Sequence, residues 1–190
     1  MTRLATLTAG SMLLVVGTLQ ADTPPDPNLA EAREIVKTFA SQLQGELQAG
    51  LKAGGPVKAI AICAERAPAI AQEISAQTGW KVGRTSLKVR NTRLDSPDAW
   101  ERQVMTDFAR RQAAGEDVQT MGYGEVVTTG SGKQFRFMKA IPTTEVCLAC
   151  HGKTITPEVA AALDARYPGD QARGFAVGDI RGAFSLSKPL

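Results

Sequence analysis

The chain has 190 residues, of which 43% are hydrophobic and 5% are aromatic. This is a soluble globular composition that excludes a disordered chain and a membrane-spanning protein, and the length suits one domain with additional segments. The net charge of +3 is too small a surplus to indicate nucleic-acid binding.

Residues 1–21 are typical of a secretory signal peptide. Arg3 provides a short positive start, and residues 4–19 form a mostly apolar run that is too short for a membrane span. Ala21 is a plausible cleavage position, although the bulky Leu19 stands where a small residue is preferred. The alternative is an uncleaved membrane anchor. In both cases we expect the rest of the chain to lie outside the cytoplasm, with no membrane span left after cleavage.

Residues 22–27 contain three prolines and predict an extended linker. The domain is expected over residues 28–190. Its first helix should start at Asn28, which forms a capping box with Glu31, and run to about residue 49, because apolar residues recur there every four positions. The glycines that should end this helix are Gly50, Gly54 and Gly55.

A second helix is expected to start at Pro56 and to be interrupted at Pro68, and a third should follow over residues 69–77 and stop at Gly79. Cys63 lies near the end of the second helix. A free cysteine is commonly a small buried core residue. In an oxidising compartment, however, a leftover thiol needs another explanation, and coordination of a metal is one.

Residues 81–93 carry five basic residues and no acidic one. If this segment is extended, Arg84 and Arg90 share one face, while Leu87 and Val89 lie on the other face and point to the core. The basic face is either a solvated strand face or a partner for carboxylates, which arginine binds through two parallel hydrogen bonds.

Alternating helix and strand patterns continue to the end of the chain. Ser96 and Pro97 should start a helix, residues 123–128 and 133–141 should form a β-hairpin, residues 156–165 a short helix and residues 178–186 a last strand. Phe135 and Phe137 share a strand face, where they pack either on a cofactor or in a plain core. Helices that precede an antiparallel sheet and lie against it predict an α+β fold.

The motif Cys147-Leu-Ala-Cys150-His151 is the attachment signal of a c-type haem. Its two thiols form thioether bonds with two vinyl groups of one porphyrin, and the histidine becomes an axial ligand of the iron. A thioredoxin-like pair would open a long helix, whereas Gly152 breaks the chain after the histidine. A zinc site would need a second pair of ligands, and the chain has no other histidine and only Cys63 as a further cysteine. The sequence therefore predicts one covalent haem c.

This reasoning does not identify the second axial ligand of the iron. It excludes a second histidine, because the chain has none. Water, a lysine or no ligand are alternatives, and so are the sulfur side chains of Cys63, Met105, Met121 and Met138.

Five segments resemble, in the same order, a bacterial family of single-haem c-type proteins with a PAS-like fold. The segments are residues 59–68, 84–91, 97–101, 147–151 and 178–183. The resemblance covers essentially the whole mature chain, apart from Asn91-Thr92, where the family usually has Asn-Pro. Members of this family occur alone in the periplasm or as sensor modules of histidine kinases.

The resemblance implies a PAS-like antiparallel sheet with a long N-terminal helix, flanking helices and a covalent haem in the core. It also implies that Cys63 is the distal iron ligand beside His151, and it favours haem propionate contacts for Arg84 and Arg90. Because bacteria attach this haem in the periplasm, it agrees with the export signal.

Two functions of different classes follow. The first is a periplasmic redox or small-ligand sensor module, with a diatomic gas as one such ligand, which would need a partner protein for its output. The second is a low-potential electron-transfer cytochrome with a redox partner. An enzyme is not expected, because the sequence has no catalytic triad, no carboxylate pair at a defined spacing, no phosphate loop and no distal histidine for a peroxidase.

Overall fold

The computed structural model describes residues 26–130 and 132–190. Its elements are α1 (Pro27–Thr78), β1 (Lys81–Thr85), α2 (Ala99–Ala113), β2 (Gly122–Thr129), β3 (Gly132–Pro142), α3 (Glu145–His151), α4 (Pro157–Arg166) and β4 (Ile180–Pro189). The signal peptide predicted for residues 1–21 lies outside the described residues. Within them, no helix combines the length and the apolar character that a membrane span requires.

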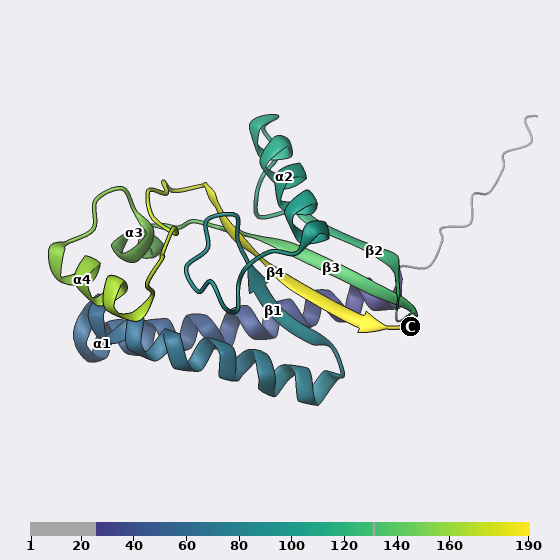
Figure 1. Ribbon diagram of the computed structural model, residues 1–190, viewed down its shortest axis with the longest axis horizontal. Coiled ribbons are helices and arrows are strands. Elements are labelled where there is room, and N and C mark those ends of the chain that lie inside the picture. The colour runs from purple at the N-terminus through teal and green to yellow at the C-terminus, as the bar shows by residue number, and fades with distance from the viewer. Residues whose placement is uncertain (1–25, 131) are drawn as a thin grey trace, which may run out of the picture.

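One antiparallel sheet, with the strand order β1-β4-β3-β2, forms the centre of the fold. Figure 1 shows the long helix α1 along one side of the sheet and α2 on the other. The predicted α+β class, with a long N-terminal helix and flanking helices around an antiparallel sheet, is confirmed. The arrangement is also consistent with the PAS-like fold that the resemblance implies.

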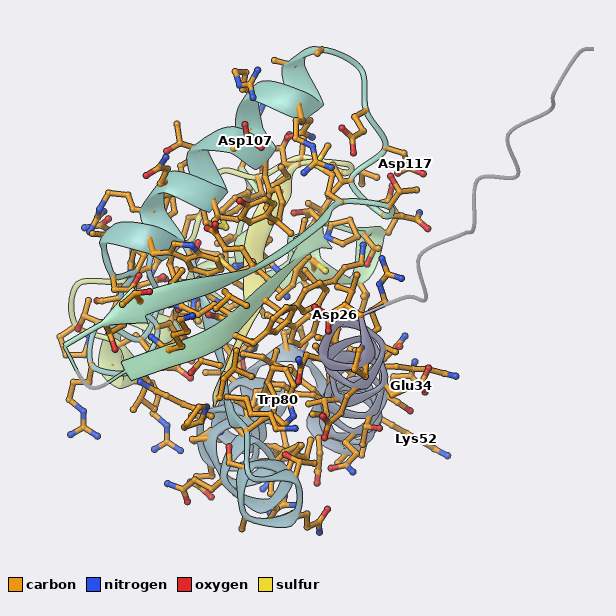
Figure 2. The ribbon with its side chains drawn as sticks, turned by 90° about the vertical axis from the view of Figure 1, so that its right-hand side faces the viewer. Asp26, Glu34, Lys52, Trp80, Asp107 and Asp117 are labelled. Carbon is orange, nitrogen blue, oxygen red and sulfur yellow. The ribbon has the colours of Figure 1, made fainter. Side chains whose placement is uncertain are left out.

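The β2–β3 hairpin agrees with its predicted boundaries to within one residue at each strand end. Phe135 and Phe137 are 3% and 1% exposed and pack in the core against α1, which decides between the two roles considered for them. Gly124 lies beneath both rings, where a Cβ would come within 3.1 Å of each. Trp80 packs edge-on against Phe135, with 6.0 Å between ring centroids, and Figure 2 shows it between the sheet and α1.

Helix α1 is a hairpin of two arms, which we call the first arm (residues 27–53) and the second arm (residues 56–78). The arms lie side by side in Figure 1. Gly55 forms the turn with φ of +69°, a left-handed value that favours glycine. A Cβ on Gly50 would lie 2.7 Å from Cα of Ala59, so glycine is needed where the arms approach this closely.

Two predicted features of α1 are wrong. The helix begins at Pro27 and is capped by Asp26, whose carboxylate accepts the N–H of Asn28 at 2.8 Å, so the cap is not Asn28 itself. Pro68 does not interrupt the second arm. A proline inside a helix costs about 3 kcal/mol, and the burial of neighbouring apolar residues such as Ile70 in the core offsets that cost.

Strand β1 ends at Thr85, well before the predicted extended segment does. Beyond this point β4 approaches so closely that a Cβ on Gly182 would lie 2.6 Å from the carbonyl oxygen of Thr85. The chain then leaves the sheet as a loop over residues 86–98, and the Ser86 hydroxyl fastens the start of this loop by donating to the carbonyl of Arg181 at 2.8 Å.

The early end of β1 changes two expectations. Arg84 lies on the strand and Arg90 in the loop, so they do not share a strand face. Leu87, which was predicted to face the core, is 42% exposed, whereas Val89 is buried as predicted.

Helix α2 starts at Ala99 after a capping box between Asp98 and Glu101, two residues later than the predicted start at Pro97. Its buried residues pack on the face of the sheet away from α1, where Asp107 marks the helix in Figure 2. The cluster there contains Val104, Met105, Phe108, Met121 and Met138.

Helices α3 and α4 lie together at one end of the molecule, beside the turn of α1 (Figure 1). Val159 and Leu163 of α4 pack on Ile60 of the second arm, and Cys150 of α3 borders this cluster. The cysteine motif is thereby held against α1 and next to the ends of β1 and β4.

Candidate functional site

A cavity of about 700 Å³ lies where α1, the ends of β1 and β4, the loop over residues 86–98 and the α3–α4 segment meet. Its wall is formed by apolar side chains together with several arginines. All six residues singled out from the sequence line it, namely Cys63, Arg84, Arg90, Cys147, Cys150 and His151.

The cysteine motif forms the short helix α3, which places Cys147, Cys150 and His151 on about two turns. Cys147 Sγ accepts from the backbone N–H of Thr144 at 3.4 Å, and neither cysteine of the motif is in a disulfide. A Cβ on Gly152 would lie 2.6 Å from the carbonyl oxygen of Leu148, so glycine is required directly after the histidine. After α4 the chain comes back to this end of α3, where Gly152 and Phe175 form a parallel bridge.

The imidazole of His151 is held in one orientation and one tautomer. Its Nδ1 lies 2.8 Å from the carbonyl oxygen of Ala172, and Nε2 lies 3.3 Å from Nη1 of Arg90. Because a carbonyl can only accept and a guanidinium can only donate, Nδ1 carries the proton and the Nε2 lone pair accepts from Arg90. Burial, together with Arg181 and Arg90, holds the pKa of His151 well below its usual range. A neutral imidazole with an unprotonated Nε2 is the form that binds metals, and a bound metal would replace Arg90 as the partner of Nε2.

The proximal loop, residues 170–175, forms the support of this imidazole. Gly174 N–H donates to the carbonyl of Gly152 and Phe175 N–H to that of His151, both at 3.0 Å. The Phe175 ring stands edge-on to the imidazole, with 6.1 Å between centroids. The loop that carries the Ala172 carbonyl is therefore tied to the end of α3.

Arg90 joins the loop over residues 86–98 to both α3 and the proximal loop. Its Nε donates to Asp170 at 3.0 Å, and its Nη2 donates to the carbonyls of Cys150 at 2.6 Å and Ala172 at 3.0 Å. Its side chain is 14% exposed, and that of Asp170 is 1% exposed. Nη1 donates to Nε2 of His151 at 3.3 Å, so a propionate contact would require Nη1 to leave the nitrogen that would bind the iron.

Cys63 lines the cavity from the second arm of α1 and is half-buried. Burial raises the pKa of its thiol, and the positive charge of Arg84 opposes this shift. The alternative sulfur ligands lie elsewhere, because Met105, Met121 and Met138 are buried between α2 and the sheet and none of them lines the cavity. Among the sulfur side chains considered from the sequence as the second ligand, Cys63 is the one that lines the same cavity as His151.

Arg181, at the start of β4, also lines the cavity and was not singled out from the sequence. Its Nε is buried without a hydrogen-bond partner in the described chain. Burial and the nearby Arg84 lower the pKa of Arg181. A buried positive charge is costly without a counter-ion. An arginine amid the apolar residues of a predicted last strand was the signal that could have marked it.

Residues 23–189 match the Tll0287-like family. The chain belongs to this family. Among solved structures, the chain resembles that of the cyanobacterial heme-protein Tll0287, with a TM-score of 0.66 and 25% sequence identity over 86% of this chain and 96% of that one. No curated protein matches the sequence.

Asp170 generates a prediction on the pH dependence of stability. Burial raises the pKa of its carboxyl group, but hydrogen bonds from Arg173 and Arg90 outweigh that effect and hold the pKa below its usual range. The folded chain then binds fewer protons than the unfolded chain just below pH ~3.9. The stabilisation is fully present above that pH and is lost as the pH falls towards the depressed value.

We expect Asp170→Asn to lower the free energy of unfolding at pH 7 by about 1.5–3 kcal/mol, the usual contribution of hydrogen bonds to a charged group. We also expect the free energy of unfolding of this variant to fall less steeply than that of the wild type between pH ~5 and ~2. Urea denaturation at a series of pH values measures both effects. Asp107→Asn is the control, because Asp107 forms its ion pairs at the exposed surface of α2. If the free energy of unfolding falls equally steeply with pH in Asp170→Asn and in the wild type, the carboxylate of Asp170 does not contribute to the pH dependence of stability.

Proposed function

We propose that this chain binds one haem covalently, through thioether bonds to Cys147 and Cys150, with His151 as an axial ligand. The observation that carries the proposal is a Cys-x-x-Cys-His helix whose histidine offers its Nε2 lone pair at the wall of a cavity of about 700 Å³. The relative Tll0287, a member of the same family by name, is described as a heme-protein, which supports the same cofactor.

The residues around the cavity fit a porphyrin better than a single metal ion. In the described chain, no group of three or more histidine, cysteine, aspartate or glutamate side chains is placed to hold a metal ion. A porphyrin supplies four ligands itself and needs at most two from the protein. The apolar wall, which includes Ile60 and Leu163, suits the macrocycle, and the cationic Arg84 suits a propionate. We retain Arg84 and Arg90 as the predicted propionate contacts.

We propose Cys63 as the second axial ligand. It is the one thiol outside the motif, it lines the cavity, and the three methionines weighed against it are buried in a different part of the core. When bound, a haem supplies an iron that alternates between the ferric and ferrous states. An anionic thiolate favours the ferric state, because ferric iron carries one more positive charge, and it keeps the reduction potential low.

The function that fits these residues best is a redox or small-ligand sensor module rather than an enzyme. A thiolate that binds ferric iron tightly and ferrous iron weakly makes the iron environment depend on the redox state. Release of Cys63 on reduction would leave a position that carbon monoxide, nitric oxide or another side chain could take. Such a module passes its state to a signalling or redox partner protein.

One prediction of this proposal concerns the covalent attachment of the haem. The protein expressed together with a c-type haem maturation system should keep its haem through acid–acetone extraction, and its mass should rise by one haem. The double variant Cys147→Ala/Cys150→Ala should release any haem that it binds. Extractable haem in the wild type, or none at all, would refute the proposal.

Another prediction of this proposal concerns Cys63 as the second axial ligand. The ferric wild type should be low-spin with thiolate features in its absorption spectrum, and Cys63→Ser should become high-spin or take a new ligand, with a raised potential. Met105→Leu is the control, because Met105 packs under α2 and should leave the spectrum unchanged. If Cys63→Ser has the ferric spectrum and potential of the wild type, Cys63 is a core residue. The electron-carrier function would then move ahead of the sensor.

We further propose that the mature protein is periplasmic and begins near Asp22, on the basis of the charged start and short apolar run of residues 1–21. N-terminal sequencing of the exported protein measures the start directly. An intact Met1 on a membrane-bound product would favour the anchored alternative.

A further inference from the structure

The carbonyl oxygen of Ala172 accepts two hydrogen bonds from two different side chains. His151 Nδ1 lies 2.8 Å from it, and Arg90 Nη2 lies 3.0 Å from it. The proton on the imidazole and a guanidinium cation therefore share one acceptor. Nothing in the sequence connects these groups, since Arg90 lies 82 residues before Ala172.

The guanidinium is fixed in this position by contacts on both sides, and its Nη1 also lies 3.3 Å from Nε2 of His151, a contact that a bound iron would replace. Arg90 Nε binds the carboxylate of Asp170 at 3.0 Å, and Nη2 also binds the Cys150 carbonyl at 2.6 Å. The same Asp170 oxygen accepts the backbone N–H of Ala172 at 2.9 Å. Asp170 thus positions both the cation and the peptide unit whose neighbouring carbonyl the cation polarises.

The partner of the second imidazole nitrogen controls how strongly a histidine donates electrons to a metal. A strong acceptor at Nδ1–H makes the imidazole more basic and a stronger ligand. A carbonyl that already accepts from a cation has less electron density to offer to a second donor. Arg90 therefore weakens the pull of the Ala172 carbonyl on the Nδ1 proton.

We propose that Arg90 is a positioning residue that limits the electron donation of His151 to a haem iron by sharing the Ala172 carbonyl. The inference rests on the proposed function, because it takes His151 as an axial ligand. It assigns to Arg90 a role on the histidine side of the haem, in addition to the predicted propionate contact. Without Arg90, the carbonyl becomes a stronger acceptor and the imidazole donates more strongly to the iron. The ferric state is then stabilised relative to the ferrous state.

The carbonyl keeps its place when Arg90 is replaced, because the loop has backbone bonds of its own. Gln171 N–H donates to the carbonyl of Val89 at 2.8 Å, and the N–H groups of Gly174 and Phe175 donate to Gly152 and His151. The effect of an Arg90 substitution is therefore a change in acceptor strength, not a displacement of the loop.

The test uses the haem-loaded protein and two variants, Arg90→Gln and Arg90→Lys. The first readout is the midpoint potential from spectroelectrochemistry. The second is the frequency of the iron–histidine stretching vibration of the ferrous protein, recorded by resonance Raman spectroscopy in a Cys63→Ala background, where no thiol competes for the iron. Arg93→Gln is the control, because Arg93 lies exposed in the same loop.

Both variants should lower the potential and raise the iron–histidine frequency, and Arg93→Gln should change neither. Arg90→Lys separates charge from geometry, because lysine keeps the charge but has a single nitrogen in place of the planar fork that spans Asp170 and the two carbonyls. If the potential falls in Arg90→Gln and is restored in Arg90→Lys, only the charge matters and the proposal is wrong. A raised potential with a lowered frequency would make Arg90 a loop anchor and would equally overturn it.

Loss of haem attachment in both variants would also count against the proposal, which supposes that the site forms without the guanidinium. These failures are distinct from a failure of the proposed function, which would appear as a wild-type protein without covalent haem. In that case no midpoint potential would exist for any of the variants.

Discussion

The arrangement of the site depends on one hydrogen bond, from Nδ1 of His151 to the carbonyl of Ala172. This bond fixes the tautomer, and the tautomer leaves the Nε2 lone pair at the cavity wall. The bond can form because Gly152 lets the chain leave α3 directly after the histidine, at a point where a Cβ would strike the carbonyl of Leu148. The proximal loop then returns alongside α3 and brings its carbonyl to the ring.

The charges around the cavity follow from the same arrangement. The hydrogen-bond donors of Arg90 mostly bind groups of the protein itself, and they join the loop over residues 86–98 to Asp170 and to two carbonyls. Arg84 and Arg181 are different, since neither forms an ion pair in the described chain and each raises the cost of the other's charge, while Asp95 is the carboxylate of the cavity wall that interacts with both. The cavity therefore favours an anionic guest with a large apolar surface, and a porphyrin with two carboxylates has that character.

Local patterns in the sequence predicted much of the fold and the centre of the site. The β2–β3 hairpin follows from alternation around a glycine-rich turn, and the cysteine motif carries its chemistry within five residues. Tertiary contacts decided the rest. The second arm of α1 passes through Pro68 because packing outweighs a local preference, and β1 ends where Gly182 of a distant strand comes close. The binding of Arg90 to Asp170 depends on such contacts as well, so no local pattern predicts it, whereas the apolar residues around Arg181 in the last strand did carry a signal of its burial.

The sheet order has a consequence for how the site is assembled. Strand β1 pairs with β4, so the last strand of the chain completes the wall that contains Arg84 and Arg181. Contacts between distant segments form late in folding, because the loops between them must close first. The residues that would bond to the porphyrin, in contrast, lie in a single short stretch. The proposed covalent step would require only this stretch, so attachment could precede closure of the cavity, and the chain would then fold around a cofactor that it already carried.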